Sequence, residues 1–361
     1  MSNSSPFNPD LINTSHTRGD SVRAIHFHNQ KLHLLDQRLL PAQEIFLTFN
    51  TPQEVACAIT DMVVRGAPAI GITAAYGIVL AAYQQIDKDT LNLKDAFKTL
   101  AASRPTAVNL FWALNKMQSE LENCLALSTA EQVAHLEKCA HDIYQDDILA
   151  NQSMGKLGAS LIEENSQLYT HCNTGSLATG GYGTALGVIR SAFQGNKVTQ
   201  VYAGETRPWL QGARLTAWEL MRDDIPVKLS SEGAAGQLLR QGNINWIIVG
   251  ADRISANGDV ANKIGTYNLA VLAKYHNVKF MVVAPSTTFD LTIQHGQDIP
   301  IEERPSEEVT KIQGIQIAPE HCEAINPSFD VTPNELIDAI ICEKGILKAP
   351  FDINIQKLLG K

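Results

Sequence analysis

Hydrophobic and polar residues alternate over short distances between residues 23 and 49. Strand-like runs over Ala24–Phe27, Lys31–Leu35 and Glu44–Phe49 are separated by residues typical of turns. This alternation predicts half-buried strands, and their close spacing predicts a small antiparallel sheet. Histidines lie on or at the end of these strands, and we expect them on the solvent-facing side: His26, His28 and His33.

From Thr51 to about Met154 the pattern becomes helical, and no strand signal interrupts it. Pro52 follows Thr51, at an expected first helical position. The segment from Gly66 to Ile86 carries no charge, which raises the question of a membrane span. It consists largely of Ala and Gly and contains Pro68, so its hydrophobicity is modest and predicts a buried helix of a soluble protein.

From Gln167 onward, strand-like and helix-like segments alternate. The predicted strands are Leu168–Cys172, Val198–Ala203, Val227–Ser230, Trp246–Gly250 and Lys279–Ala284. The predicted helices are Ala185–Phe193, Gly212–Met221, Gly233–Arg240 and Gly265–Tyr275. This alternation is typical of a doubly wound parallel sheet. After a polar, acidic loop at 301–305, one more helix is expected following Thr332-Pro333.

The pattern therefore predicts an α/β protein with two domains. Residues 1–20, rich in Ser and Asn, are expected to form a loose tail rather than a signal peptide. Residues 21–145 are expected to form the small antiparallel sheet and a helical bundle. Residues 146–361 are expected to form a Rossmann-like catalytic domain.

Composition narrows the class of partner. The 361 residues hold 29 basic and 38 acidic side chains, a formal charge of -9, which argues against a nucleic-acid surface. The cysteines are scattered, without a C-x-x-C pair, and predict no zinc site and no disulfide framework: Cys57, Cys124, Cys139, Cys172, Cys322 and Cys342. A reducing, cytoplasmic setting fits this pattern.

Reactive or charged residues follow several predicted strands. The apolar run Trp246–Gly250 is followed by Asp252, another strand ends at His171-Cys172, and a third runs into Glu205. Because the carboxyl ends of parallel strands share one edge, these groups should converge on one crevice, where open α/β sheets bind ligands. An Asp that only caps the next helix is the plainer alternative for Asp252.

Cys172 precedes the glycine-rich stretch 174–183, which contains neither a dinucleotide fingerprint nor a Walker loop. No nucleotide cofactor is expected. A helix start directly after the cysteine would offer amides to a thiolate or to a ligand oxyanion. An inert buried thiol is the alternative. Adjacent strand residues point to opposite faces, so His171 and Cys172 are not expected to form a dyad, and no cluster has metal-ligand spacing.

Arginines precede three predicted helix starts, at Arg65-Gly66-Ala67-Pro68, Arg104-Pro105 and Arg207-Pro208, and Lys263 lies near another. Open amides at a helix start together with a guanidinium suit a phosphate group. Each alone fits a structural cap; together they predict a phosphate site built partly from the N-terminal domain.

At this point the residues resemble the methylthioribose-1-phosphate isomerases, a family within a superfamily that includes regulatory subunits of translation initiation factor 2B. The resemblance extends from about Arg18 to Leu347 and lies in these segments: Arg65-Gly-Ala-Pro-Ala-Ile-Gly71, Ser103-Arg-Pro-Thr-Ala-Val-Asn109, His171-Cys-Asn-Thr-Gly175, Glu205-Thr-Arg-Pro208, Gln211-Gly-Ala-Arg214, Gly250-Ala-Asp-Arg-Ile254 and Asn257-Gly-Asp-Val-Ala-Asn-Lys-Ile-Gly-Thr266. One position departs from the family pattern: Gly204 stands where a polar residue is more common.

The resemblance implies the roles of individual residues. Asp252 would be the proton donor, and Cys172 would stabilise the transition state or exchange protons with it. The implied substrate-binding residues are Arg65, Gly66, Ala67, Arg104, Gln211, Asn262 and Lys263. It also implies a sugar phosphate substrate and a homodimer acting in methionine salvage. Composition and motifs, as described above, predict no cofactor, no metal, no nucleic acid and no membrane, and a cytoplasmic protein.

The implied reaction converts 5-methylthioribose 1-phosphate to 5-methylthioribulose 1-phosphate. An acid must assist ring opening, because the anomeric phosphate blocks simple hemiacetal opening. Hydrogen then moves from C2 to C1 through an enol or enolate, or as a hydride; the sequence leaves both open. It also leaves open 5-deoxyribose 1-phosphate, ribose 1,5-bisphosphate or a non-catalytic regulatory subunit. Aromatic candidates for a methylthio pocket are Trp112, Trp209 and Tyr202.

Overall fold

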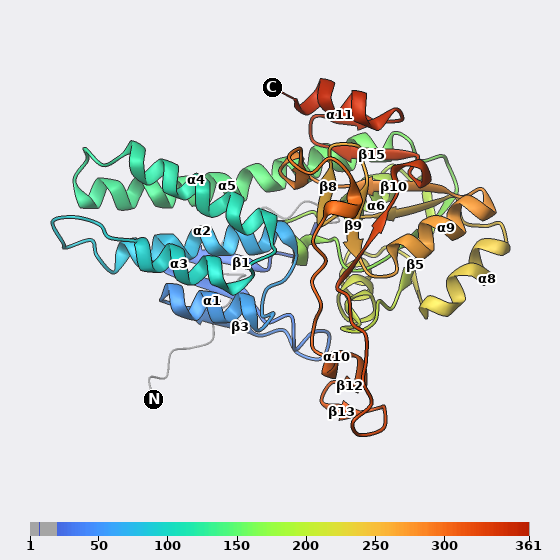
Figure 1. Cartoon of the computed structure of the whole chain (residues 1–361), viewed down its shortest axis with the longest axis horizontal. Coiled ribbons are helices and arrows are strands. Elements are labelled where there is room, and N and C mark those ends of the chain that lie inside the picture. The colour runs from blue at the N-terminus through green and yellow to red at the C-terminus, as the bar shows by residue number, and fades with distance from the viewer. Residues whose placement is uncertain (1–6, 8–19, 361) are drawn as a thin grey trace. The chain divides into compact units, whose positions relative to one another are not determined.

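The computed structural model describes Phe7 and residues 20–360 (Figure 1). The chain divides into two compact units, Met1–Leu149 with Ser176–Gly183, and Ala150–Gly175 with Thr184–Lys361. The predicted tail at 1–20 lies outside the described residues, apart from Phe7 and Asp20. The predicted boundary after residue 145 falls inside one long helix, α5 (Thr129–Ala159).

The first unit contains the predicted small sheet. Strands β1 (Ile25–His28), β2 (Lys31–Leu35) and β3 (Phe46–Phe49) pair antiparallel in that order.

The expectation that the three histidines face solvent is wrong for two of them. His26 and His33 are buried, and the ring of Phe7 stacks on His33 with centroids 3.8 Å apart. Burial lowers the pKa of His33 to about 4, with His26 as the next cause. Only His28 of the three is exposed. The alternation predicted the strands correctly, but aromatic rings cover a face that polarity alone assigns to water.

Four α-helices follow within the described part of the first unit, and α5 begins there and ends in the second: α1 (Pro52–Thr60), α2 (Ala67–Tyr83), α3 (Lys94–Ser103), α4 (Val108–Asn123) and α5. Thr51 caps α1 by accepting the backbone N–H of Glu54, whose carboxylate accepts the N–H of Thr51 in return. Pro52 is the first helical residue, as predicted.

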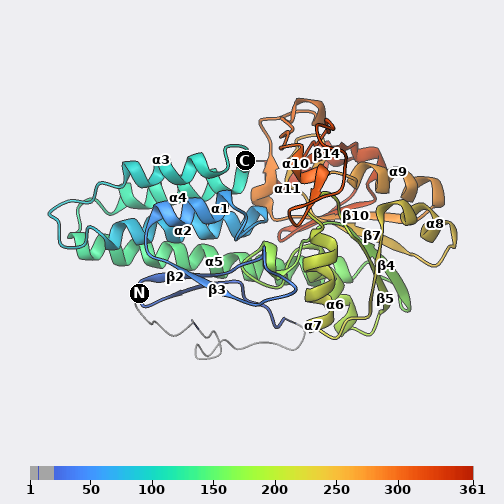
Figure 2. The same ribbon diagram turned by 90° about the horizontal axis from the view of Figure 1, so that it is seen from below.

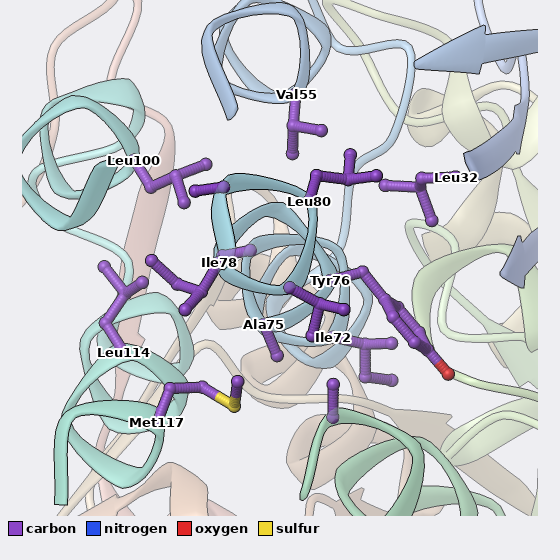
Figure 3. Packing of buried hydrophobic residues seen from close by; sticks show 14 of the residues in the cluster. Leu32, Val55, Ile72, Ala75, Tyr76, Ile78, Leu80, Leu100, Leu114 and Met117 are labelled. Atoms are coloured by element: carbon purple, nitrogen blue, oxygen red, sulfur yellow. The ribbon is translucent and has the colours of Figure 1, made fainter. Parts of the chain in front are cut away.

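Helix α2 is the centre of this unit's core, and its middle is buried all round. Figure 3 shows side chains from the surrounding elements closing around it, with Leu32 from β2, Val55 from α1, Leu100 from α3 and Met117 from α4. A helix that is apolar on every face is buried in protein or in lipid. None of the described helices is long and apolar enough to cross a membrane, and in α2 the other helices and the sheet cover every side.

The second unit contains a mostly parallel sheet with strand order β16-β15-β10-β7-β4-β5-β6. Its parallel strands are β4 (Ser166–Thr170), β5 (Val198–Gly204), β6 (Val227–Ser230), β7 (Trp246–Val249), β10 (Lys279–Val283) and β15 (Ala339–Cys342); β16 (Gly345–Leu347) is antiparallel. The order runs outward in both directions from β4 and β7, which is the doubly wound arrangement.

Successive strand residues point to opposite faces, and helices cover both. On one face Leu168 and Ile248 pack with α6 (Ala185–Gln194) and α7 (Ala217–Arg222). On the other, Tyr169 and Ile247 pack with α8 (Ala235–Arg240), α9 (Thr266–His276) and α11 (Phe351–Leu359). Figure 2 shows α6 on one side of β4 and β5, and α8 and α9 on the other. The predicted fold class is confirmed.

A smaller sheet was not predicted. Its order is β11 (Phe289–Asp290), β8 (Arg253–Ser255), β9 (Val260–Lys263) and β14 (Phe329–Thr332). A short helix α10 (Glu307–Thr310) and the hairpin β12 (Lys311–Ile312) and β13 (Ile315–Gln316) lie between β11 and β14. The helix expected after Thr332-Pro333 is only a 3₁₀ turn at Asn334–Leu336; two strands, β15 and β16, follow before α11.

Candidate functional site

Cys172 and Asp252 follow the two strands between which the strand order reverses. Thr170 of β4 lies beside Ile248 of β7, and its hydroxyl donates to the Ile248 carbonyl at 2.8 Å. Cys172 comes two residues after the first of these and Asp252 four residues after the second. Open α/β sheets bind ligands at this switch point, beyond the carboxyl ends of the strands.

The chain after β4 passes close over the end of β7. A Cβ added to Gly250 would lie 2.7 Å from Cγ2 of Thr174. A larger residue at 250 would therefore push the loop that carries Cys172 away from β7. This contact gives Gly250 a steric reason to be glycine.

The backbone of Cys172 is held in a conformation that its side chain disfavours. Its φ is 62°, in the left-handed region that non-glycine residues seldom occupy. The Cys172 N–H donates to Oγ1 of Thr206 at 2.8 Å, and the Cys172 carbonyl accepts from Oγ1 of Thr216 at 2.6 Å. Such conformations persist where the surroundings determine them strongly, and they cluster at functional sites.

Cys172 is buried, with 5% of the residue exposed, and its thiol lies beside a predicted binding residue. Nε2 of Gln211 contacts Sγ at 3.4 Å. Gln211 is itself buried, and its Oε1 has no hydrogen-bond partner in the described structure. An amide oxygen buried without a partner is costly unless a ligand satisfies it. The structure thus brings Cys172 and Gln211 together, with an open acceptor next to the thiol.

Buried charges lie behind the Cys172 loop. Nδ2 of Asn173 donates to Oε1 of Glu219 at 2.9 Å. Glu219 in turn pairs with Arg190 at 2.9 Å, and Arg190 also pairs with Asp223 at 2.7 Å. A Cβ at Gly175 would overlap the Glu219 carboxylate, so the loop rests directly on this network.

A hairpin brings Asp252 close to two predicted binding residues. Strands β8 and β9 pair antiparallel, and the Asp252 N–H donates to the Ala261 carbonyl at 2.9 Å. Asp252, just before β8, therefore lies across from Asn262 and near Lys263 at the end of β9. Nδ2 of Asn262 donates to Oγ1 of Thr266 at 2.9 Å, which fixes that side chain.

His171 connects the hairpin to the Cys172 loop. Its Nε2 lies 2.8 Å from the Ile264 carbonyl, which can only accept, so Nε2 carries the proton. Its Nδ1 lies 3.4 Å from Oγ1 of Thr206, the group that also binds the Cys172 N–H. Burial lowers the pKa of His171 to about 4, so the ring is neutral near pH 7. It links two loops rather than acting as a base on the thiol.

Asp330 lies on β14, which pairs antiparallel with β9 and places Asp330 opposite Asn262. Its carboxylate accepts the N–H groups of Gly265 at 2.7 Å and Tyr267 at 3.1 Å, at the start of α9. Burial raises its pKa to about 6, against the lowering effect of these two hydrogen bonds and of Lys263. Nζ of Lys263 lies 4.9 Å from the centre of the Phe329 ring.

The other predicted binding residues belong to the first unit. Arg65, Gly66 and Ala67 stand at the start of α2, where Gly66 has φ 101° and a Cβ there would lie 2.5 Å from Ala178. Arg104 follows the last residue of α3 and precedes α4. The helix-start prediction is therefore correct at Arg65 and wrong at Arg104, where a short loop separates the arginine from α4.

Two further expectations about helix starts are wrong. Arg207-Pro208 lies in a turn before the next helical segment, and the Arg207 guanidinium donates to the carbonyls of Pro208 and Val309. Directly after Cys172 there is only a 3₁₀ turn, η2 (Ser176–Ala178), and α6 begins at Ala185. The glycines serve close packing rather than an immediate helix.

The aromatic candidates for a methylthio pocket are engaged in different ways. The Tyr202 hydroxyl donates to Oε1 of Gln167 at 3.1 Å, near the beginning of β4 and thus away from the carboxyl edge. Cζ of the Arg214 guanidinium lies over the Trp209 ring, 4.3 Å from its centre. In the first unit, Nζ of Lys116 lies over the Trp112 ring, 5.6 Å from its centre.

Several residues that shape the site escaped sequence analysis: Arg190, Thr206, Thr216, Glu219 and Asp330. Thr206 lies inside the Glu205-Thr-Arg207 motif, but its hydroxyl contacts Cys172 only because β4 and β5 are neighbours in the sheet. The others lie on helices or on a strand that periodicity describes as ordinary. No three His, Cys, Asp or Glu side chains among the described residues form a group that could hold a metal ion.

An open groove elsewhere in the second unit has a volume of about 670 Å³ and lies between the Asn257 loop and α11. Asp352 and Lys357 line it, but none of the predicted site residues does. The groove is therefore not the candidate site, which remains at the carboxyl ends of β4 and β7.

A doubly wound sheet with a thiol and a carboxyl group after neighbouring strands at its switch point defines an α/β protein that binds a small ligand. The chain belongs to the initiation factor 2 subunit family, whose sequence profile matches residues 63–349. It is 57% identical over 335 residues to the methylthioribose-1-phosphate isomerase of Thioalkalivibrio sulfidiphilus, covering 92% of this chain and 95% of that protein. The corresponding protein of Alcanivorax borkumensis is 53% identical, with 94% and 97% covered.

Solved structures agree with this placement. The crystal structure of 5-methylthioribose 1-phosphate isomerase from Pyrococcus horikoshii OT3 is 42% identical with a TM-score of 0.89, covering 95% of this chain and 98% of that one. A structure described as translation initiation factor eIF-2B, subunit delta, from A. fulgidus is 41% identical with a TM-score of 0.84, covering 94% and 100%. The resemblance found in the sequence motifs is confirmed.

Proposed function

We propose that this chain is an aldose–ketose isomerase that converts 5-methylthio-D-ribose 1-phosphate to 5-methylthio-D-ribulose 1-phosphate. The observation that carries the proposal is identity of 57% across 92% of the chain to a protein named for that substrate. The positions of Cys172 and Asp252 after neighbouring strands β4 and β7 support it, because the reaction needs both an acid and a base at one carbon skeleton.

The first route open to these groups is an enol route. Protonated Asp252 gives its proton to the ring oxygen while the bond from C1 to that oxygen breaks. The Cys172 thiolate then removes the proton from C2, leaving an enol across C1 and C2. The thiol returns that proton to C1 as Asp252 accepts the proton of the C2 hydroxyl, so the ketone forms and both side chains regain their initial states.

The second route is a hydride shift from C2 to C1 after the same ring opening, with the C2 hydroxyl losing its proton as the ketone forms. Turnover in D₂O separates the two. Deuterium at C1 of the product supports the enol route, since a thiol exchanges with solvent. Absence of deuterium from C1, with the hydrogen of C2 carried over instead, supports the hydride shift and leaves Cys172 a stabilising role.

Substrate binding is assigned to Arg65, Gly66, Ala67 and Arg104 of the first unit and to Gln211, Asn262 and Lys263 of the second. Cationic side chains suit the phosphate, and the backbone at Gly66 and Ala67 offers helix-start amides. We expect Lys263→Met and Arg65→Gln each to raise KM strongly. Lys274→Met, which removes an exposed lysine of α9, is the matched control and should leave KM unchanged.

The decisive experiment compares turnover of 5-methylthioribose 1-phosphate, 5-deoxyribose 1-phosphate and ribose 1,5-bisphosphate by the same preparation. Preference for the first supports the proposal, and preference for the bisphosphate removes the methylthio assignment. Cys172→Ser and Asp252→Asn should each abolish turnover while substrate still binds, as measured by calorimetry. A near-normal rate in either variant rejects the role given to that residue.

A second candidate function is a regulatory subunit of a translation factor, which the 41% identity to the A. fulgidus structure favours. A scaffold has no need of an acid and a thiol at the switch point, and the fold does not separate the two functions. Absence of turnover on all three sugar phosphates would favour this candidate.

We also propose that the enzyme acts as a cytoplasmic homodimer in methionine salvage. The scattered cysteines, without a C-x-x-C pair, support a reducing compartment. Light scattering after gel filtration measures the oligomeric state directly, and a mass of one chain would reject the dimer.

A further inference from the structure

The helix that follows the Glu205-Thr-Arg207 motif begins with an unusual turn. Residues Gly212–Thr216, labelled η3, form a π-helix that continues into α7. The Ala217 N–H donates to the Gly212 carbonyl, five residues earlier. Such turns are rare in proteins, and those that occur often lie at functional sites. The position of the side chains on this turn is therefore informative.

The π-helical turn brings two side chains to the same residue. Gln211 and Thr216 are five positions apart, and both contact Cys172: Nε2 of Gln211 at Sγ, 3.4 Å, and Oγ1 of Thr216 at the carbonyl, 2.6 Å. In an α-helix, residues five apart diverge by about 140° around the axis. In a π-helical turn they lie one turn apart, on the same side.

The two contacts act on different parts of Cys172. Thr216 holds the carbonyl of a residue whose φ is 62°, and Thr206 holds its N–H from the opposite side. Thr216 also accepts from Nδ2 of Asn173 at 3.3 Å, so it fixes the following residue as well. With the backbone held at both ends, the direction of the Cα–Cβ bond of Cys172 is set, and the contact from Nε2 of Gln211 holds Sγ itself.

We infer that the π-helical turn Gly212–Thr216 is a positioning device for Cys172, and that Thr216 is a positioning residue for the reaction. This inference rests on the role proposed above for the Cys172 thiol. The Thr216 hydroxyl touches no reacting atom; it holds the thiol in the geometry that proton transfer requires, and misplacement by about 1 Å costs on the order of 10²-fold in rate.

The test compares Thr216→Val, which keeps the shape and removes the hydroxyl, with Thr216→Ser, which keeps the hydroxyl. We expect kcat to fall about 10²-fold in Thr216→Val, with a smaller change in KM, and Thr216→Ser to retain most of the activity. Ser166→Ala is the matched control. Its buried hydroxyl also donates to a carbonyl, that of Glu163 at 2.7 Å, but at the amino end of β4, so kcat should not change.

A double-variant cycle with Gln211→Met tests whether the two side chains act through the same group. If both orient Cys172, the double variant should be little worse than the worse single variant, because contacts within one network are not additive. The comparison is made in kcat, because Gln211 is also a proposed substrate-binding residue whose loss affects KM. Effects on kcat that multiply would overturn the inference. Thermal unfolding checks that each variant is folded; if Thr216→Val is not, Thr216→Ala replaces it.

The outcomes separate this inference from the proposed function. Normal turnover by Cys172→Ser would remove the role of the thiol itself. An inactive Cys172→Ser together with normal kcat in folded Thr216→Val would overturn the inference alone. Equal loss of kcat in Thr216→Val and Thr216→Ser would also overturn it, since the hydroxyl would then be irrelevant.

Discussion

Arg190 and Glu219 form an ion pair in which neither side chain is exposed, with Nη2 and Oε2 2.9 Å apart. Arg190 makes a second pair with Asp223, and Glu219 also accepts from Asn173, the residue after Cys172. The attraction of both carboxylates outweighs burial and raises the pKa of the guanidinium above its ordinary value. A fully buried ion-pair network therefore contacts the residue that follows the predicted catalytic thiol.

Removing one partner of this network should be costly. We expect Arg190→Met to lower the free energy of unfolding by about 3–5 kcal/mol, because two buried carboxylates would lose their counter-charge. Urea unfolding followed by circular dichroism measures the change. The control is Lys138→Met, which breaks the exposed pair with Asp142 and should give no resolvable difference. Equal midpoints for the wild type and Arg190→Met would contradict this account.

Gly212 is a second point at which the fold depends on a single residue. A Cβ there would overlap the Gly204 carbonyl oxygen, so backbone must move to admit alanine. We expect Gly212→Ala to lower the apparent Tm by many degrees and to abolish activity. Gly233→Ala is the matched control, because a Cβ at that position meets nothing within 4 Å. A folded, active Gly212→Ala would show that the first turn of this helix adapts freely.

Periodicity was enough to predict five strands of the main sheet, β4, β5, β6, β7 and β10, and the helices between them, but it missed β15 and β16. Val227–Ser230 is predicted and observed with the same bounds, because turn residues end it on both sides. The sequence also placed Asp252 after the apolar run Trp246–Gly250, and Cys172 at the end of a predicted strand. What periodicity missed is short or irregular: β8 and β9 have three and four residues, and their pairing is fixed by the turn at Asn257-Gly258-Asp259.

The polar partners of the site could not be predicted, for a physical reason. Thr216 and Gln211 lie too far apart to share the face of an α-helix, and only the π-helical turn makes them neighbours. Glu219 lies on α7, where a solvated carboxylate is the usual expectation, but its ion pair with Arg190 of α6 buries it instead. Such contacts depend on how elements cross in space, which the order of residues along one element does not specify.

The departure from the family pattern at Gly204 has a steric correlate. A Cβ at this position would lie 2.8 Å from the Tyr169 hydroxyl, which is itself 3.3 Å from Oγ of Ser230. We expect Gly204→Ala to lower stability by about 1–3 kcal/mol through overpacking. In Tyr169→Phe the hydroxyl is gone, so the same Gly204→Ala change should cost less. Identical costs in the two backgrounds, measured by urea unfolding, would show that Tyr169 does not constrain position 204.

Asp330 predicts a pH dependence of stability in the mildly acidic range. Its pKa rises from 3.8 unfolded to about 6 in the folded protein, so the folded state holds the proton more tightly. Between these values the folded state binds more protons than the unfolded chain, and stability falls as pH rises. The amide introduced by Asp330→Asn cannot titrate. The unfolding free energy of the wild type should therefore decrease relative to Asp330→Asn by on the order of 1–2 kcal/mol from pH 4 to pH 6, and the difference should stay constant above pH 7. Urea unfolding of both proteins across this range measures it. A difference that grows in favour of the wild type as pH rises would mean that the Gly265 and Tyr267 hydrogen bonds, rather than burial, dominate the carboxyl group.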